Sequence, residues 1–292
     1  MLTDLEPKAA SREAFTRADA ERVLACGDLV SVGVLAEAAR RAAHADRVSF
    51  VQVLDGAALS QAADVEFGEV RLTAPIPSWT AGAGLVTAAR AVSRGRPVTG
   101  FTAEALLALA GGDHLALADG ARQLREAGLT AVAALAIDET DDPGAVVRAL
   151  AHAGLPVWRV VVRRPAPVER RLDLIERVAA LQAATGALRA FAPLPIEDPV
   201  DVPSTGYDDV RTIAVARLMC PSVPSIQVDW AQYGPKLAQV ALAYGADDLD
   251  NVPAVDDLGL GRRRSPREEI ERQIEAAFAT PVARDGAFEP LR

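Results

Sequence analysis

The chain has 292 residues, half of them hydrophobic, and a formal net charge of −9 at pH 7. This length suits one α/β barrel or two small domains and is ample for a full core. The acidic balance argues against a general nucleic-acid binder, and no run approaches the roughly 20 apolar residues of a membrane helix. The charged N-terminus lacks the apolar region of a signal peptide, and the two cysteines, Cys26 and Cys220, fit a reducing compartment. A cytoplasmic protein is expected, with neither nucleic acid nor a membrane as partner.

Two helices are predicted within residues 15–43, because apolar residues recur there at helical spacing and Gly27-Asp28 interrupts the pattern. Short β-rich runs follow at residues 47–54, 69–73, 97–101, 129–137, 156–162, 187–192, 225–228 and 246–249. Amphipathic helical patterns lie between and after them, at residues 81–93, 113–127, 143–153, 168–185, 207–219, 235–244 and 266–278, and the remaining tail is predicted to be irregular.

Strands that alternate with helices through short connections indicate βαβ units and a parallel sheet. Eight strand candidates in a chain of this size favour a TIM-type (β/α) barrel, complete or partial. We expect one domain, 1–292, with N-terminal helices (1–45), the barrel (46–260) and a C-terminal helix and tail (261–292). Residues 54–68 are short for a crossover helix, so a loop, a dimer partner or another protein must cover that side. A homodimer across this gap is the prediction.

Residues 191–251, FAPLPIEDPVDVPSTGYDDVRTIAVARLMCPSVPSIQVDWAQYGPKLAQVALAYGADDLDN, resemble aminofutalosine synthase, a radical S-adenosylmethionine (SAM) enzyme of the futalosine route to menaquinone. They are more loosely similar to cyclic dehypoxanthinyl futalosine synthase and to the deazaflavin (FO) synthases. Three further segments resemble the same family: GDLVSVGVLAEAARRAAHADRVSF (27–50), GFTAEALLALAGGDH (100–114) and LREAGLTAVAALAIDE (124–139). The resemblance implies the family's barrel and a link to its pathway.

The chain departs from the family where the family binds its cofactors. That family holds a [4Fe–4S] cluster on a CxxxCxxC motif after the first barrel strand, whereas this chain continues VQVLDGAALSQAADVEFGEVRLTAP without a cysteine. Thr73-Ala74-Pro75 stands in place of a Gly-Gly pair used in SAM binding, and a glycine-rich segment expected after residue 139 is missing. Three thiolates must hold the cluster so that one iron stays open for SAM. We therefore expect no cluster and no other cofactor.

Functional side chains of a parallel barrel lie at the carboxyl ends of its strands. The catalytic candidates chosen by this rule are carboxylates able to exchange protons, namely Asp138, Glu139, Asp229 and Asp248. The substrate-binding candidates are Arg163, Arg164, Glu197, Asp229, Trp230 and Asp250, since arginine can fork onto the carboxylate of a polar nucleoside. The alternative is that these charges are solvated or paired with one another.

No metal site is predicted, because His44, His114 and His152 are scattered over helices without ligand spacing. Two functions remain open. The first is a pseudoenzyme that binds a nucleoside or assists a radical SAM enzyme of menaquinone synthesis. The second is a cluster-independent lyase, hydrolase or transferase that acts on a futalosine-type nucleoside by acid/base chemistry. An unrelated role on a reused scaffold is a third alternative.

Overall fold

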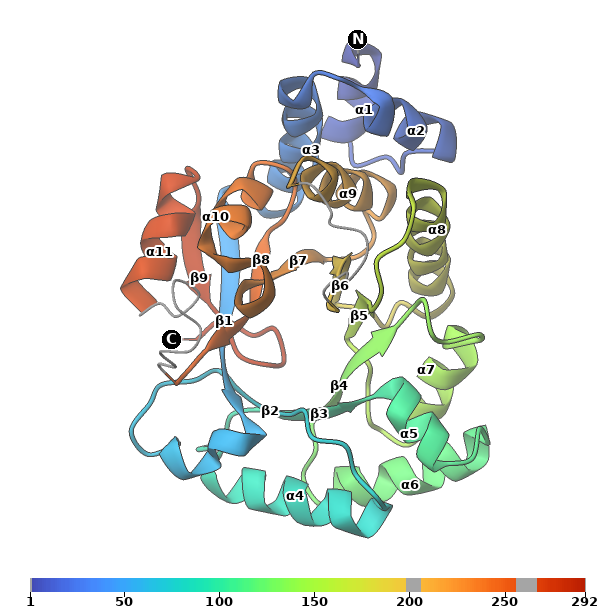
Figure 1. Ribbon diagram of the computed structural model, residues 1–292, viewed down its shortest axis with the longest axis vertical. Helices are drawn as coiled ribbons and strands as arrows, with labels where there is room; N and C mark the ends of the chain where they lie inside the picture. Colours follow the sequence, from blue (N-terminus) through green and yellow to red (C-terminus); the bar gives the residue numbers. More distant parts are fainter. Residues whose placement is uncertain (1, 198–205, 256–266, 292) are drawn as a thin grey trace.

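The computed structural model describes residues 2–197, 206–255 and 267–291. Eight parallel strands pair in chain order, and the first pairs with the last, so the sheet closes into the predicted TIM-type barrel (Figure 1). The barrel strands are β1 (Arg47–Asp55), β2 (Glu69–Leu72), β3 (Val98–Thr102), β4 (Ala131–Ala136), β5 (Arg159–Val162), β6 (Ala190–Pro195), β7 (Ser225–Asp229) and β8 (Asp248–Pro253).

Helices surround the barrel and pack apolar side chains against its outer wall (Figure 1). They are α4 (Trp79–Val92), α5 (Ala103–Leu109), α6 (His114–Glu126), α7 (Pro143–His152), α8 (Val168–Thr185), α9 (Gly206–Met219) and α10 (Trp230–Leu242). Helix α5 was missed by the sequence analysis; Thr102 caps it by accepting the N–H of Ala105.

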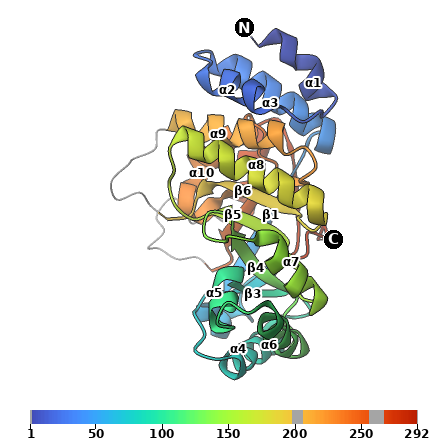
Figure 2. The same ribbon diagram turned by 90° about the vertical axis from the view of Figure 1, so that its right-hand side faces the viewer.

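The N-terminal segment forms η1 (Thr3–Leu5), α1 (Glu6–Ala10), α2 (Arg17–Ala25) and α3 (Leu29–His44), which pack over α9 at one side of the barrel (Figures 1 and 2). Asp28 caps α3, since its carboxylate accepts the N–H of Val30 at 3.0 Å. The two predicted helices are thereby confirmed, and α1 precedes them.

A loop covers the barrel side where a crossover helix was expected to be missing. Its 3-10 turn η2 (Gly56–Gln61) follows β1, and the side chains of Ala62 and Phe67 are buried below it. The guanidinium of Arg94 lies 4.6 Å from the centre of the Phe67 ring. The sequence analysis considered a loop, a dimer partner or another protein at this side, and in the structure a loop covers it.

The C-terminal tail is not irregular, so that prediction was wrong. After α11 (Arg267–Ala276), strand β9 (Thr280–Ala283) pairs in parallel with Arg47–Phe50 of β1, whereas β2 pairs only with Val53–Asp55. Strand β9 therefore takes the part of the β1 edge that β2 leaves free. A Cβ on Gly68 would collide with the carbonyl oxygen of Arg284, so this close approach requires glycine.

Two helical glycines give opposite predictions for stability. Gly84 of α4 is exposed with open space around its Cβ position, so Gly84→Ala is expected to raise the unfolding free energy by about 0.5–1 kcal/mol. A Cβ on Gly120 of α6 would overlap the Trp79 ring, so Gly120→Ala is expected to lower it by about 1–3 kcal/mol. Urea unfolding of both variants checks this packing of α4 on α6. Equal effects of the two substitutions would contradict it.

Candidate functional site

The lower interior of the barrel is filled by an ion-pair network. Strand alternation points Val70 and Leu72 outward into the main core, so Glu69 and Arg71 of β2 point inward. By the same alternation, the inward set holds three arginines and three carboxylates: Glu69, Arg71, Arg159, Asp248, Asp250 and, from the tail, Arg284.

Each charge of this network has a partner of opposite sign. Arg284 forks onto Asp248, with its Nη2 2.7 Å from Oδ1 and its Nε 2.5 Å from Oδ2. Both terminal nitrogens of Arg71 lie 3.0 Å from the Asp250 carboxylate, and the same guanidinium contacts Glu69 at 2.8 and 2.9 Å. Arg159 reaches Asp250 at 3.0 Å.

The network fixes the charge state of Asp250. Burial alone would raise the pKa of its carboxyl, but Arg159, Arg71 and Arg284 together hold that pKa well below its usual range. Asp248 is 0% and Asp250 is 1% exposed, so both carboxylates lie below the barrel surface and are already compensated. This arrangement favours a structural role for Asp248 and Asp250 over contact with a substrate.

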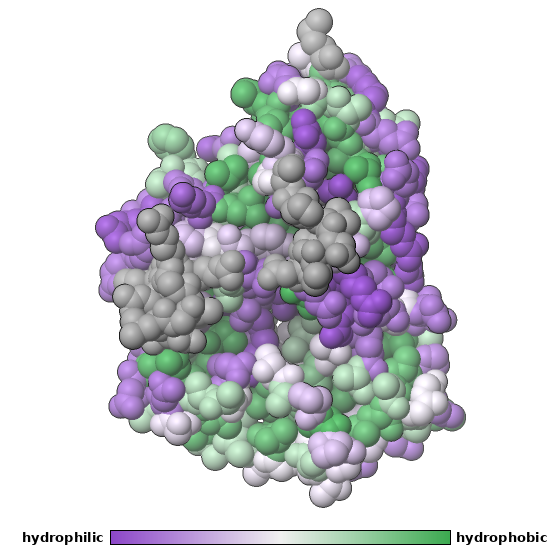
Figure 3. Space-filling model, in the orientation of Figure 1, coloured by the Kyte–Doolittle hydropathy of each residue, from purple (hydrophilic) through white to green (hydrophobic). Residues whose placement is uncertain are grey.

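Above the network, small side chains line the interior on the carboxyl-end side of the strands. Ala134, Ala136, Val161 and Ala192, from β4, β5 and β6, form a small apolar cluster separate from the main core. Viewed from this side, the molecule is hollowed near its centre (Figure 3). Small walls above a charged floor are the arrangement in which a barrel can hold a ligand at its catalytic end.

Asp229 lies at the junction of the charged floor and the small walls. It caps α10 by accepting the N–H of Gln232 at 2.9 Å, and it accepts the amide of Asn251 at 3.0 and 3.2 Å. Burial raises the pKa of the Asp229 carboxyl, and Arg159, 3.9 Å away, opposes this shift only in part. A buried carboxyl with a raised pKa at this end of a barrel is a candidate acid or base.

The predicted charges at the barrel mouth pair with one another, as the alternative interpretation stated. Asp138 accepts the backbone N–H groups of Arg163 and Arg164 at 2.8 and 2.9 Å, which joins two strand ends. The Arg163 guanidinium contacts Glu139 at 3.3 Å and Glu197 at 2.5 Å, and Arg164 contacts Glu139 at 2.9 Å. Arg164 is 69% exposed, so a ligand can reach these arginines by displacing their present partners.

Trp230 is placed differently from the other candidates. Its side chain is fully buried in the main core at the first turn of α10, which gives it a packing role. Sequence reasoning also missed Arg71, Arg159 and Arg284. The available signal for Arg71 and Arg159 was a charged residue within a short apolar strand, in EVRL and RVVV respectively.

The isosteric change Asp229→Asn is expected to leave the unfolding free energy at pH 7 unchanged or to raise it by up to about 1 kcal/mol. Asparagine still caps α10, and a raised carboxyl pKa destabilises the fold above that pKa. The advantage is expected to disappear as the pH falls below about 4, because the carboxyl then becomes protonated in the unfolded state as well as in the folded one. Chemical unfolding at the two pH values tests this, and a loss of more than 2 kcal/mol at pH 7 would contradict it.

Comparisons with known proteins show which sequences this chain is similar to. Residues 198–290 match the family described as CofH/MqnC C-terminal region. Aminodeoxyfutalosine synthase of Thermus thermophilus is 33% identical over 140 residues, which is 43% of this chain and 37% of that protein. The 5-amino-6-(D-ribitylamino)uracil–L-tyrosine 4-hydroxyphenyl transferase of Methanopyrus kandleri is 31% identical over 171 residues, 53% of this chain and 46% of that protein. The chain thus spans less than half the length of these relatives.

Two solved structures share the fold over nearly the whole chain. Methylornithine synthase superposes with a TM-score of 0.71 at 15% identity, over 95% of this chain and 97% of that one. The [FeFe]-hydrogenase maturase HydG superposes with a TM-score of 0.68 at 11% identity, over 96% of this chain and 76% of that one. The protein is therefore a (β/α) barrel with the same fold as these two structures. Its C-terminal part is similar to the CofH/MqnC C-terminal family and to the aminodeoxyfutalosine synthases, as the resemblance predicted.

The donor groups of this chain do not fit a three-cysteine cluster. Cys26 ends α2 outside the barrel, and the Cys220 thiol is buried with its Sγ 3.6 Å from the carbonyl oxygen of Ile175. Burial raises the pKa of the Cys220 thiol to about 12, and two cysteines cannot supply the three thiolates that the cluster requires. Within residues 2–197, 206–255 and 267–291, no histidine, cysteine and carboxylate group is suited to a metal ion, and no helix is long and apolar enough for a membrane span.

Proposed function

We propose that this chain is a cytoplasmic, cluster-free pseudoenzyme that binds a futalosine-type nucleoside and serves menaquinone synthesis as an accessory protein. One observation carries the proposal: the region matched to the CofH/MqnC C-terminal family is retained, while neither cysteine lies at the end of a barrel strand. The relatives' activity is not carried over, because the chain covers only 37% of the aminodeoxyfutalosine synthases.

The upper interior of the barrel is the proposed nucleoside site. The small apolar side chains of β4, β5 and β6 would face a flat base above the charged floor. Asp229 and Asn251 offer an acceptor and a donor to ribose hydroxyls at one wall. Arg163 and Arg164 are exposed enough to exchange Glu139 and Glu197 for a ligand carboxylate at the mouth.

A second candidate function is favoured by Asp229 itself. Burial raises the pKa of its carboxyl above the usual value, so a cluster-independent reaction on the same nucleoside would use Asp229 as acid or base. Asp229→Asn would then abolish product formation while leaving nucleoside affinity within about threefold. Chromatography of nucleoside incubated with wild type and variant separates this enzyme from the binding protein, which forms no product in either case.

The accessory role requires a protein partner, which we propose to be a radical SAM enzyme of the same pathway. A homodimer is the other assembly that we propose to test. A loop already covers the β1–β2 side of the barrel and buries Ala62 and Phe67. Neither the complex nor the homodimer is therefore needed to cover that side. Light scattering of the purified chain, alone and mixed with that enzyme, distinguishes a dimer, a complex and a monomer.

Titration calorimetry tests the nucleoside site. Aminodeoxyfutalosine and its dehypoxanthinyl derivative are titrated into the metal-free chain, with SAM as the control ligand. We expect micromolar affinity for a nucleoside, at least tenfold weaker binding to Arg163→Gln, and no heat from SAM. The exposed Arg148, on α7, supplies the matched control Arg148→Gln, which should bind as wild type does. Absence of heat from both nucleosides would refute the nucleoside-binding proposal.

A further inference from the structure

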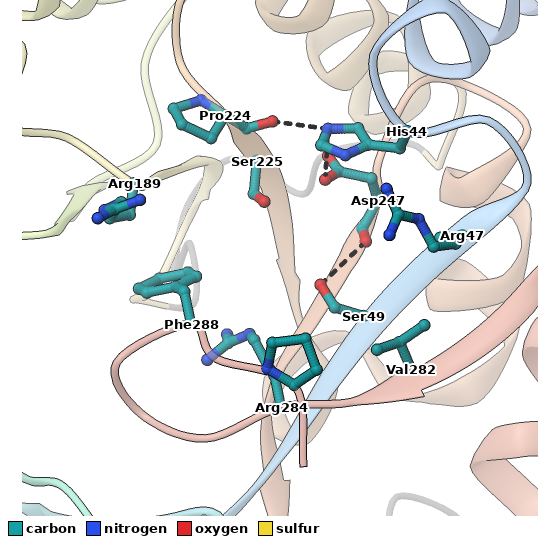
Figure 4. Close-up of a pocket in the computed structure, with 11 residues that line it drawn as sticks. His44, Arg47, Ser49, Arg189, Pro224, Ser225, Asp247, Val282, Arg284 and Phe288 are labelled. Carbon is teal, nitrogen blue, oxygen red and sulfur yellow. Dashed lines mark hydrogen bonds and ion pairs between the residues drawn. The ribbon is translucent and has the colours of Figure 1, made fainter. Parts of the chain in front are cut away.

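A second pocket opens at the amino-terminal end of the barrel, opposite the proposed nucleoside site. It has a volume of about 220 Å³ and is walled by β1, the starts of β6, β7 and β8, and the tail after β9 (Figure 4). The Arg284–Asp248 and Arg71–Asp250 ion pairs fill the interior between the two ends. This pocket is therefore a separate site and does not depend on the proposed function.

The pocket carries a surplus of positive charge. Its carboxylate Asp247 is already neutralised, because the buried Arg217 pairs with it and the N–H of Ile226 donates to it at 2.8 Å. Arg47 and Arg189 line opposite walls (Figure 4), and neither side chain has a hydrogen bond or ion pair among the residues that the structure describes. Two uncommitted guanidinium groups that face one small pocket favour an anionic ligand.

The carboxylate nearest to Arg47 along the chain does not occupy the pocket. Asp46 is exposed, lies outside the pocket lining, and accepts the hydroxyl of Thr280 at 2.8 Å. Asp248, bound by Arg284, also accepts the hydroxyl of Ser49 from the pocket wall. The Ser225 hydroxyl lines the pocket between the two arginines and adds a neutral donor (Figure 4).

An aromatic wall completes the pocket and is held in place before any ligand arrives. Phe288 has a backbone φ of 67°, a left-handed conformation that a bulky residue adopts only when its surroundings enforce it. The Phe288 ring meets Trp158 edge to face at 6.5 Å, and the Arg284 guanidinium lies 4.2 Å from its centre.

We propose that this pocket binds a small organic anion, whose carboxylate or phosphate group is attracted by Arg47 and Arg189 on opposite walls and whose apolar or aromatic body lies against Phe288. The volume lies below the roughly 300–1,000 Å³ typical of pockets for drug-sized ligands, which sets a metabolite of about one ring as the upper size. Because the pocket includes the tail, ligand binding also stabilises the insertion of Arg284 into the barrel.

Calorimetry with four simple probes tests the proposal: benzoate, phenyl phosphate, inorganic phosphate and the uncharged benzamide. We expect benzoate or phenyl phosphate to bind with a Kd below about 1 mM and benzamide to bind at least tenfold more weakly. The stronger of the two aromatic anions identifies the preferred head group. Inorganic phosphate should bind at least threefold more weakly than phenyl phosphate, because it makes no contact with Phe288.

Variants assign the binding to this pocket. Arg47→Gln and Arg189→Gln remove exposed side chains that have no partner in the described structure, so both variants should fold, and each should weaken anion binding at least threefold. Arg148→Gln removes the same charge elsewhere and should change nothing. Equal binding of benzamide and benzoate, unchanged affinity in both pocket variants, or no binding of any probe at about 10 mM would each overturn the proposal.

Discussion

Replacing Arg284 by methionine is expected to lower the free energy of unfolding by about 3–5 kcal/mol, because it breaks one side of a buried ion pair. Arg284 is 3% exposed and forks onto Asp248, which is 0% exposed. Methionine fills a similar volume but leaves that carboxylate buried without its main partner. Breaking one side of a buried pair is far more destabilising than replacing both sides.

Urea unfolding at pH 7 measures this effect, with the exposed Arg148→Met as the matched control, expected to stay within about 0.5 kcal/mol of wild type. The double variant Arg284→Met/Asp248→Asn should recover part of the lost unfolding free energy.

The effect of Arg284→Met should also depend on pH, because Arg284 helps to depress the pKa of the Asp250 carboxyl. A depressed carboxyl pKa stabilises the fold at pH values above the unfolded-state pKa of about 4. That contribution is lost as the pH falls from there through the folded-state pKa. The difference in unfolding free energy between wild type and Arg284→Met should therefore become smaller below about pH 4. A loss under 1 kcal/mol at pH 7 would show that the tail does not enter the barrel.

Trp230→Ala is expected to lower the free energy of unfolding by about 3–5 kcal/mol, because it empties a large, fully buried volume in the main core. The residue was predicted to bind substrate, and its burial assigns it to packing instead. Trp230→Phe keeps most of that volume and should lose at most about 2 kcal/mol while leaving nucleoside affinity unchanged.

Phe278→Ala is the control for Trp230→Ala, since it deletes an aromatic ring that is 85% exposed and should change stability by less than about 0.5 kcal/mol. Thermal and urea unfolding measure both. Should Trp230→Phe fold with wild-type stability yet lose nucleoside binding, Trp230 would be a ligand contact and not a packing residue.

The barrel was predictable because its signal is local. Strands such as β4 and β5 are short apolar runs, each followed by an amphipathic helix, and that alternation defines parallel βαβ units. Strand β9 gave no such signal. Its four residues become a strand only because β2 leaves part of the β1 edge free, and that edge lies more than 200 residues earlier in the chain.

The strand-end positions of the candidate side chains were predictable, but their pairing with one another was not. The strand-end rule found Asp229 and the mouth charges, because strand ends follow directly from the strand pattern. It did not show that Arg163 binds Glu139 and Glu197, since those residues approach one another only when β4, β5 and β6 lie side by side. Arg284 lies in the tail, so no local pattern connects it to Asp248 inside the barrel.

The central claim, that this barrel binds a nucleoside without an iron–sulfur cluster, is tested most directly by one comparison. The affinity for aminodeoxyfutalosine is measured on the same preparation before and after anaerobic incubation with ferrous iron and sulfide, together with bound iron per chain. The account predicts equal micromolar affinity in both samples and no bound cluster, because Cys26 and Cys220 are placed where they cannot hold one. Stoichiometric cluster binding, with nucleoside or SAM affinity that appears only afterwards, would contradict it.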